Sequence, residues 1–132
     1  MRLLQRVLLL MALVWAVCGV AIGAAPSFVL VTMFDLPEPP DFGYARVAGV
    51  LSFSLALLMV MISRRLEQLW WFAWAFVVAA ASTAVVAADT ALFGLPEGAS
   101  ALLWWTFAAT STAFAVGLLL GLAKSGTERS PA

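Results

Sequence analysis

Long apolar stretches separated by short polar segments set the pattern of this 132-residue chain. A helix rises about 1.5 Å per residue, so about 20 apolar residues cross a hydrocarbon core of about 30 Å. The four uninterrupted stretches reach or approach that length over residues 7–25, 47–63, 69–88 and 101–123. The pattern predicts an all-α membrane protein with a single integral membrane domain over residues 1–132. We expect a four-helix transmembrane bundle whose spans cover about residues 5–25, 45–63, 69–89 and 101–123.

The connections between the stretches carry local signals. The turn over residues 64–68 is short, which predicts an antiparallel hairpin of the second and third spans. Residues 7–34 lack charge and as one helix would be about 42 Å long, longer than the hydrocarbon core. Pro26 offers a break, because proline removes a helical hydrogen bond. We expect residues 26–34 to form a short interfacial helix after the first span, the alternative being a kinked extension of that span, and Asp41 to cap the second span.

Two similar pentapeptides follow the first and third spans. Residues 34–38 are Phe-Asp-Leu-Pro-Glu, and residues 93–97 are Phe-Gly-Leu-Pro-Glu, 59 positions later. Each pentapeptide would lie between an outgoing and a returning helix. The repeat therefore favours two tandem hairpins related by an axis along the membrane normal. The alternative is a chance match between two loops that both use proline and an acid at a membrane interface.

Small residues recur at four-residue spacing in every span. Lipid removes the hydrophobic drive between helices, so close backbone approach must supply the packing energy, and small residues permit it. The sequence predicts either packing inside the bundle or a surface for a homo-oligomer or a membrane partner. The residues concerned are Gly19 and Gly23, Ala45 and Gly49, Ala80, Ala84 and Ala88, and Ala109, Ala113, Gly117 and Gly121.

If the chain crosses the membrane an even number of times, nearly all basic residues lie on one face of the membrane. Basic residues in short loops stay in the cytoplasm, so both termini and the 64–68 turn are predicted to be cytoplasmic. The first apolar run exceeds the roughly 7–15 residues of a signal-peptide core, so we expect an uncleaved first helix. The cytoplasmic face would carry Arg2, Arg6, Arg64, Arg65, Lys124 and Arg129, and the other face only Arg46.

Composition limits the partners and the chemistry. Hydrophobic residues make up 64% of the chain and charged residues 11%, which places the protein in a lipid bilayer. The net charge is zero, so a nucleic-acid partner, which needs a basic stripe, is not expected. There is no histidine, and Cys18 is the only cysteine. We therefore expect no metal site, no cofactor, no Cys-x-x-Cys redox chemistry and no enzymatic activity.

Hydroxyls and one indole are the candidate ligand-binding groups within the membrane. Thr106 and Thr110 in the fourth span, with Ser82 and Thr83 in the third, could line a polar pocket, and Trp74 could stack on a ligand. The alternative is that the hydroxyls bond to carbonyls of their own helix and that the tryptophan marks the head-group level.

Two charges near one membrane face form the other candidate cluster. Arg46 begins the second span and Asp89 ends the third, so both are predicted at the outer interface, where they could form a structural ion pair. Asp35, Glu38 and Asp41 are competing partners for Arg46. Helix dipoles disfavour a cation at an N-terminus and an anion at a C-terminus, which favours such a compensating contact.

The order of these features resembles the DoxX-like group of small bacterial four-helix membrane proteins. The resemblance rests on a basic N-terminus, the Pro26-led segment to Phe34, Arg46 with Gly49, and the Arg64–Arg65 pair. It implies a four-helix bundle in the bacterial cytoplasmic membrane, and a role in some cases as a subunit of a membrane redox complex. The small multidrug transporters are similar in size, but their first helix carries a glutamate, and residues 7–25 contain no acid.

The residues together favour a binding or accessory subunit for an apolar, lipid-like ligand or a membrane partner. A small transporter or channel is the alternative, and a subunit of a membrane redox complex is the third hypothesis. A water-accessible path lined by the hydroxyls would favour transport.

Overall fold

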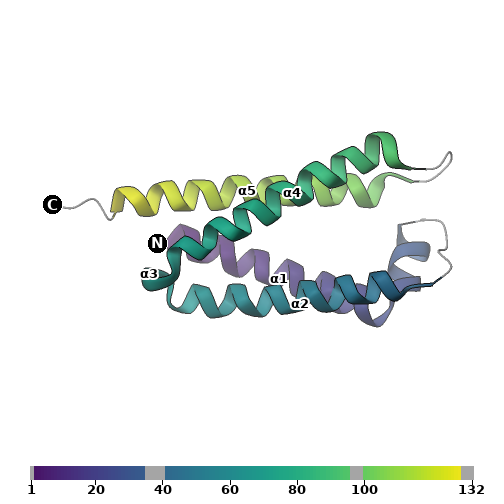
Figure 1. The fold of residues 1–132 in the computed structure, drawn as a ribbon, viewed down its shortest axis with the longest axis horizontal. Helices are drawn as coiled ribbons and strands as arrows, with labels where there is room; N and C mark the ends of the chain where they lie inside the picture. The colour runs from purple at the N-terminus through teal and green to yellow at the C-terminus, as the bar shows by residue number, and fades with distance from the viewer. Residues whose placement is uncertain (1, 35–40, 96–99, 129–132) are drawn as a thin grey trace.

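The computed structural model describes residues 2–34, 41–95 and 100–128, and these residues form helices joined by short breaks (Figure 1). Within the described residues, four helical segments are long and apolar enough to cross a membrane, which confirms the expected helices and four candidate spans. The described part of the chain contains no strand. The elements are α1 (Arg2–Ala24), η1 (Phe28–Met33), α2 (Gly43–Arg64), α3 (Leu66–Leu69), η2 (Trp70–Phe72), α4 (Ala73–Asp89), η3 (Thr90–Gly94) and α5 (Leu102–Glu128).

The long helices pack as two hairpins. Helix α1 packs mainly on α2, and α4 mainly on α5. The contact between α1 and α5 joins the two hairpins, whereas α2 and α4 make few contacts although they follow one another in the chain. Figure 1 shows α4 crossing away from α2. The arrangement agrees with the geometry expected of two tandem hairpins, and their origin by duplication stays a prediction.

The connection between α2 and α4 is tighter than the turn expected over residues 64–68. Helix α2 ends at Arg64 and helix α3 begins at Leu66. Arg65 leaves the helical conformation, with φ −127° and ψ 41°, and its carbonyl oxygen accepts the N–H of Leu69 at 3.0 Å. Leu69 leaves it again, with φ −116° and ψ 17°, directly before η2. Leu66 is only 5% exposed and belongs to the core. Burial of this leucine explains why the helix resumes at once.

Helix α1 is followed by a separate short helical segment. The break falls at Ala25, directly before Pro26, which is buried. The N–H of Val29 donates to the Ala25 carbonyl oxygen at 3.1 Å, so hydrogen bonding resumes immediately. In Figure 1 this segment, η1, turns away from the axis of α1. A short helical segment therefore stands where it was expected, and its position at a membrane interface stays a prediction.

The shared core lies in one half of the molecule. We call the end where α1 begins, α3 lies and α5 ends the basic end (Figure 1). Towards the opposite end the two hairpins diverge in Figure 1. The core cluster is confined to the half of each helix nearest the basic end: residues 4–12 of α1, 56–62 of α2, 73–80 of α4 and 114–122 of α5, with Leu66.

Glycines set the closest contacts between helices. A Cβ placed on Gly19 would lie 2.6 Å from the carbonyl oxygen of Gly49, so α1 and α2 cross with their backbones in contact. A Cβ on Gly121 would lie 2.9 Å from the Cα of Leu4, which places α5 against α1 near the basic end. Several of the small residues thus pack inside the molecule, whereas Ala109 and Ala113 are exposed. Their use in an oligomer stays a prediction.

Candidate functional site

One stripe of α1 changes from buried to half-buried along the helix. Its residues recur at alternating four- and three-residue spacing, so they share one face. Near the basic end the stripe is fully covered by α2 and α5, and beyond Met11 it is not. The stripe consists of the buried Leu4, Leu8 and Met11, followed by the half-buried Trp15, Cys18 and Ile22.

A matching stripe on α5 faces α1. Gly121 and Gly117 lie against Leu4 and Val7 of α1, as a Cβ on Gly117 would be 3.2 Å from Val7 Cγ1. The same heptad spacing continues this stripe through the buried Phe114 to the half-buried Thr110 and Phe107. We call the half-buried parts of the two stripes the inter-hairpin face. It consists of Trp15, Cys18 and Ile22 on α1, with Phe107 and Thr110 on α5.

Aromatic packing shapes the α5 side of this face. Phe107 packs edge-on against Trp104, with ring centroids 6.3 Å apart and planes at 78°. The Trp104 indole N–H is buried and has no hydrogen-bond partner among the residues that the structure describes. A buried indole usually finds an acceptor, and an unpaired buried donor costs about 1–3 kcal/mol. Nothing in the sequence indicates that this indole N–H lacks a partner.

The expected hydroxyl pocket is not assembled as one site. Thr106 Oγ1 donates to the Leu102 carbonyl oxygen at 2.7 Å, and Thr83 Oγ1 donates to the Ala79 carbonyl oxygen at 2.7 Å. Ser82 is exposed, and Thr110 alone of the four lies on the inter-hairpin face. Trp74 is exposed at the start of α4, near the basic end, whereas Thr106 lies near the start of α5, at the opposite end. A helical hydroxyl that bonds four residues back is satisfied without a ligand.

Arg46 and Asp89 lie at the same end of the molecule but in different hairpins. Both are exposed, and within the described residues no ion pair joins them. Their separation follows from the divergence of α2 and α4 towards this end. Asp41, a competing partner, accepts the N–H of Gly43, the first residue of α2, at 2.8 Å, but Phe42 and not Asp41 holds the N-cap position. Asp35 and Glu38, the other competitors, lie outside the described residues.

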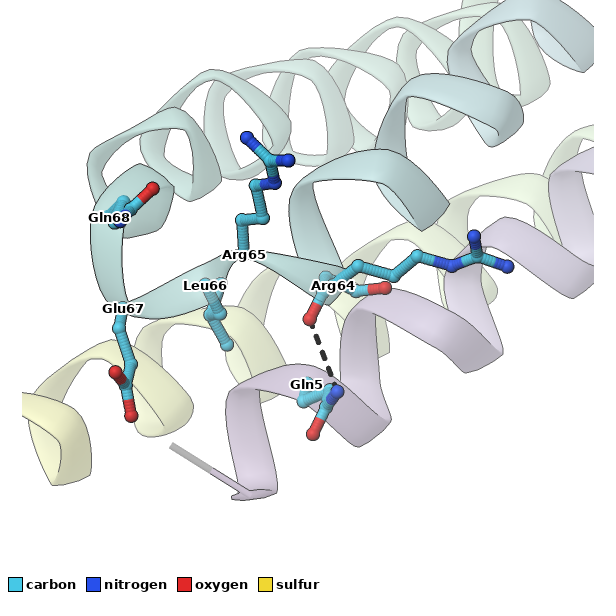
Figure 2. Close-up of a pocket in the computed structure, with 7 residues that line it drawn as sticks. Gln5, Arg64, Arg65, Leu66, Glu67 and Gln68 are labelled. Carbon is cyan, nitrogen blue, oxygen red and sulfur yellow. Dashed lines mark hydrogen bonds between the residues drawn. The ribbon is translucent and has the colours of Figure 1, made fainter.

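A polar depression of about 600 Å³ lies at the basic end, where sequence reasoning placed no site (Figure 2). The Gln5 amide nitrogen donates to the Ser63 carbonyl oxygen at 3.1 Å and so ties α1 to the end of α2. The adjacent pair Arg64–Arg65 was the available sequence signal, but it served only to orient the chain in the membrane. The lining residues are Gln5, Ser63, Arg64, Arg65, Leu66, Glu67 and Gln68.

No protein-family model, curated protein or solved structure matches this chain. The resemblance to the DoxX-like group therefore stays a prediction. A functional proposal rests on the geometry of the two hairpins and on the polar groups at their ends.

Proposed function

We propose that this protein is a binding or accessory subunit of the bacterial cytoplasmic membrane. It acts by packing, not by catalysis. In this proposal the basic end faces the cytoplasm, and the inter-hairpin face receives an apolar, lipid-like ligand or the transmembrane helix of a partner. The role as a subunit of a redox complex, which the DoxX-like resemblance implies, is one form of the same activity.

The observation that carries the proposal is the change along the α1 stripe. Leu4, Leu8 and Met11 are fully buried, and residues at the same face beyond them are only half-buried. In a closed bundle the same stripe would be covered along its whole length. Ile22 and its neighbours on this face are only partly covered, so dispersion contacts with a well-fitting chain or helix can form there.

The polar groups support packing over transport. Hydroxyls of Thr83, Thr106 and Thr112 each donate to the carbonyl four residues earlier at 2.7 Å. Groups satisfied in this way have little reason to coordinate a passing solute or a file of water. The inter-hairpin face itself is formed by an indole, a thiol, an aliphatic side chain, a phenyl ring and a single hydroxyl. That chemistry suits an apolar occupant.

Photo-crosslinking in native membrane tests the proposal. We would replace Ile22 by p-benzoyl-phenylalanine, isolate the full chain after irradiation and identify adducts by mass spectrometry. The matched control carries the same probe at Leu13, which is 60% exposed on the opposite face of α1. We expect one predominant lipid or protein adduct from position 22 and bulk phospholipid from position 13. Bulk phospholipid from both positions would contradict the proposal.

Cys18 offers a direct test of the transport alternative. It lies on the inter-hairpin face and is the only thiol of the chain. A charged, membrane-impermeant thiol reagent should leave Cys18 unmodified in sealed vesicles of either orientation. An Arg64→Cys variant in a Cys18→Ser background, with its thiol at the exposed basic end, should react in inverted vesicles and serves as the control. Modification of Cys18 would indicate a water path and favour the transporter.

A further inference from the structure

Positive charge is concentrated at the basic end. The described residues place five basic side chains there and only Arg46 at the opposite end. The helices enter the apolar region directly beyond this end, so these charges lie at the depth of lipid head groups. The five are Arg2, Arg6, Arg64, Arg65 and Lys124.

The turn between α2 and α3 holds two of these arginines in fixed positions. Ser63 and Leu66 on either side of the pair are 2% and 5% exposed, so the backbone is anchored in the core and both arginines must project outward. The hydrogen bond from Gln5 to the Ser63 carbonyl oxygen holds the turn against α1. The arginine backbones are therefore positioned before any ligand binds, which lowers the entropic cost of binding.

The charged side chains around the depression point in different directions. Figure 2 shows the Arg64 side chain extending along α1, and the Arg65 side chain and Gln68 on the other side of the turn. Glu67 also lines the depression, but its carboxylate points away from the Arg65 guanidinium (Figure 2). The guanidinium groups thus reach both flanks of the turn. Guanidinium groups bind phosphate oxygens through paired N–H donors, and their charge persists at every physiological pH.

We propose that the depression formed by Gln5 and residues 63–68 binds the phosphodiester head group of an anionic phospholipid. The polar lining, the two outward arginines and the position at the end of the apolar helices together fit this ligand. A zwitterionic phospholipid carries a compensating ammonium and gains less from the same charges. The inference requires a protein that spans the membrane but is independent of any occupant of the inter-hairpin face.

The test compares two lipids with identical acyl chains. The full chain in neutral detergent is mixed with dioleoyl-phosphatidylglycerol or dioleoyl-phosphatidylcholine, and bound lipid is counted by native mass spectrometry. We expect clear preference for phosphatidylglycerol, weakened by added salt. Replacement of both arginines in Arg64→Gln/Arg65→Gln should lower that preference by about tenfold or more, since each basic residue near a surface contributes about fivefold. Arg46→Gln, an equivalent substitution at the opposite end, should leave the preference unchanged.

Several results would overturn the inference. Equal binding of the two lipids by the wild-type chain would do so without any variant, so the test survives even if the double variant fails to fold. An equal loss of preference in Arg46→Gln would assign it to overall charge. Displacement of phosphatidylglycerol by inorganic phosphate in large excess would indicate a site for the free anion. Retention of preference by Arg64→Lys/Arg65→Lys would support a site built on charge at these positions.

Discussion

At the scale of single residues, the absence of a side chain matters as much as its presence. Gly19 and Gly49 let the backbones of α1 and α2 touch, since a Cβ on either would lie 2.6 Å from a backbone oxygen of the other. In lipid, where helices gain nothing from excluding water, such close approach is a principal source of association energy. The α1–α2 hairpin therefore depends on two hydrogen atoms in place of two methyl groups.

Substitution of Gly19 tests this dependence. Gly19→Ala should destabilise the protein by about 1–3 kcal/mol, because the added methyl group meets backbone that can only yield by separating the helices. Gly126 is the matched control: it lies in α5, and a Cβ added there would meet nothing within 4 Å, so Gly126→Ala should be neutral or stabilising by up to about 1 kcal/mol. Thermal unfolding in detergent, followed by circular dichroism, measures both. Equal melting temperatures for the two variants would contradict the role given to Gly19.

At the scale of elements, the contact between α1 and α5 decides whether there is one bundle or two separate hairpins. The other extensive contacts between long helices lie within each hairpin, and α2 makes few contacts with α4. Gly121 brings α5 against the backbone of α1 at Leu4, whereas Gly117 meets only the side-chain methyl groups of Val7. The two glycines, one turn apart, therefore meet different resistance when a methyl group is added.

This difference predicts which of the two glycine substitutions weakens the contact between α1 and α5 more. A Cβ on Gly121 would lie 2.9 Å from Leu4 Cα, and one on Gly117 would lie 3.2 Å from Val7 Cγ1, a side-chain atom at a longer distance. Gly121→Ala should therefore lower the melting temperature more than Gly117→Ala, with a destabilisation of about 1–3 kcal/mol. Parallel thermal unfolding of the two variants, normalised to wild type, measures the order. The reverse order would mean that α1 and α5 pack in another register.

The elements also mark what sequence could predict. Four apolar runs of membrane-spanning length identify four helices, because hydrocarbon leaves the backbone few alternatives. The apolar runs do not show which helices pack against each other. A short turn brings α2 and α4 close at one point, but it does not fix their crossing angle, and the structure separates them beyond the turn. Burial of Leu66 starts the third helical segment earlier than the polar residues of the turn indicated.

The candidate site was harder to predict for a related reason. Nearly every residue of α1 is apolar, so the stripe through Met11, Trp15 and Ile22 does not stand out against its surroundings. In a soluble helix the same spacing would be visible as an amphipathic pattern. Residue type drew attention to Thr83 and Thr106 instead, but their hydroxyls bond within their own helices. Only three-dimensional packing distinguishes the face that is left open.

At the scale of the whole molecule, charge predicts the orientation in the membrane. The basic end carries five basic side chains of the described residues, and basic residues in short connections are retained in the cytoplasm. In a Cys18→Ser background, Arg65→Cys at the basic end and Tyr44→Cys at the opposite end report the two sides; Tyr44 is 91% exposed. An impermeant thiol reagent should label only Tyr44→Cys in spheroplasts and only Arg65→Cys in inverted vesicles. The reverse labelling would contradict the predicted orientation.

The divergence of the hairpins is a property of the whole molecule, and distances between spin labels test it. In a Cys18→Ser background, one cysteine pair replaces Met61 and Leu120, which are exposed in α2 and α5 near the basic end. A second pair replaces Val47 and Leu102, which are exposed in the same two helices near the opposite end. Because the core joins the hairpins only near the basic end, the first pair should give a narrow distance distribution. The second pair should give a longer and broader one.

Double electron–electron resonance on the full chain in lipid nanodiscs measures both distributions. The first pair serves as the internal control, since it joins the same helices through the shared core. An occupant of the inter-hairpin face would narrow the second distance distribution and leave the first unchanged. Only the half of the molecule away from the shared core can change its conformation on binding. Equally narrow distributions without any occupant would mean that the helices pack along their whole length. The half-buried stripe of α1 would then be covered in the membrane, and a binding role for that face would lose its physical basis.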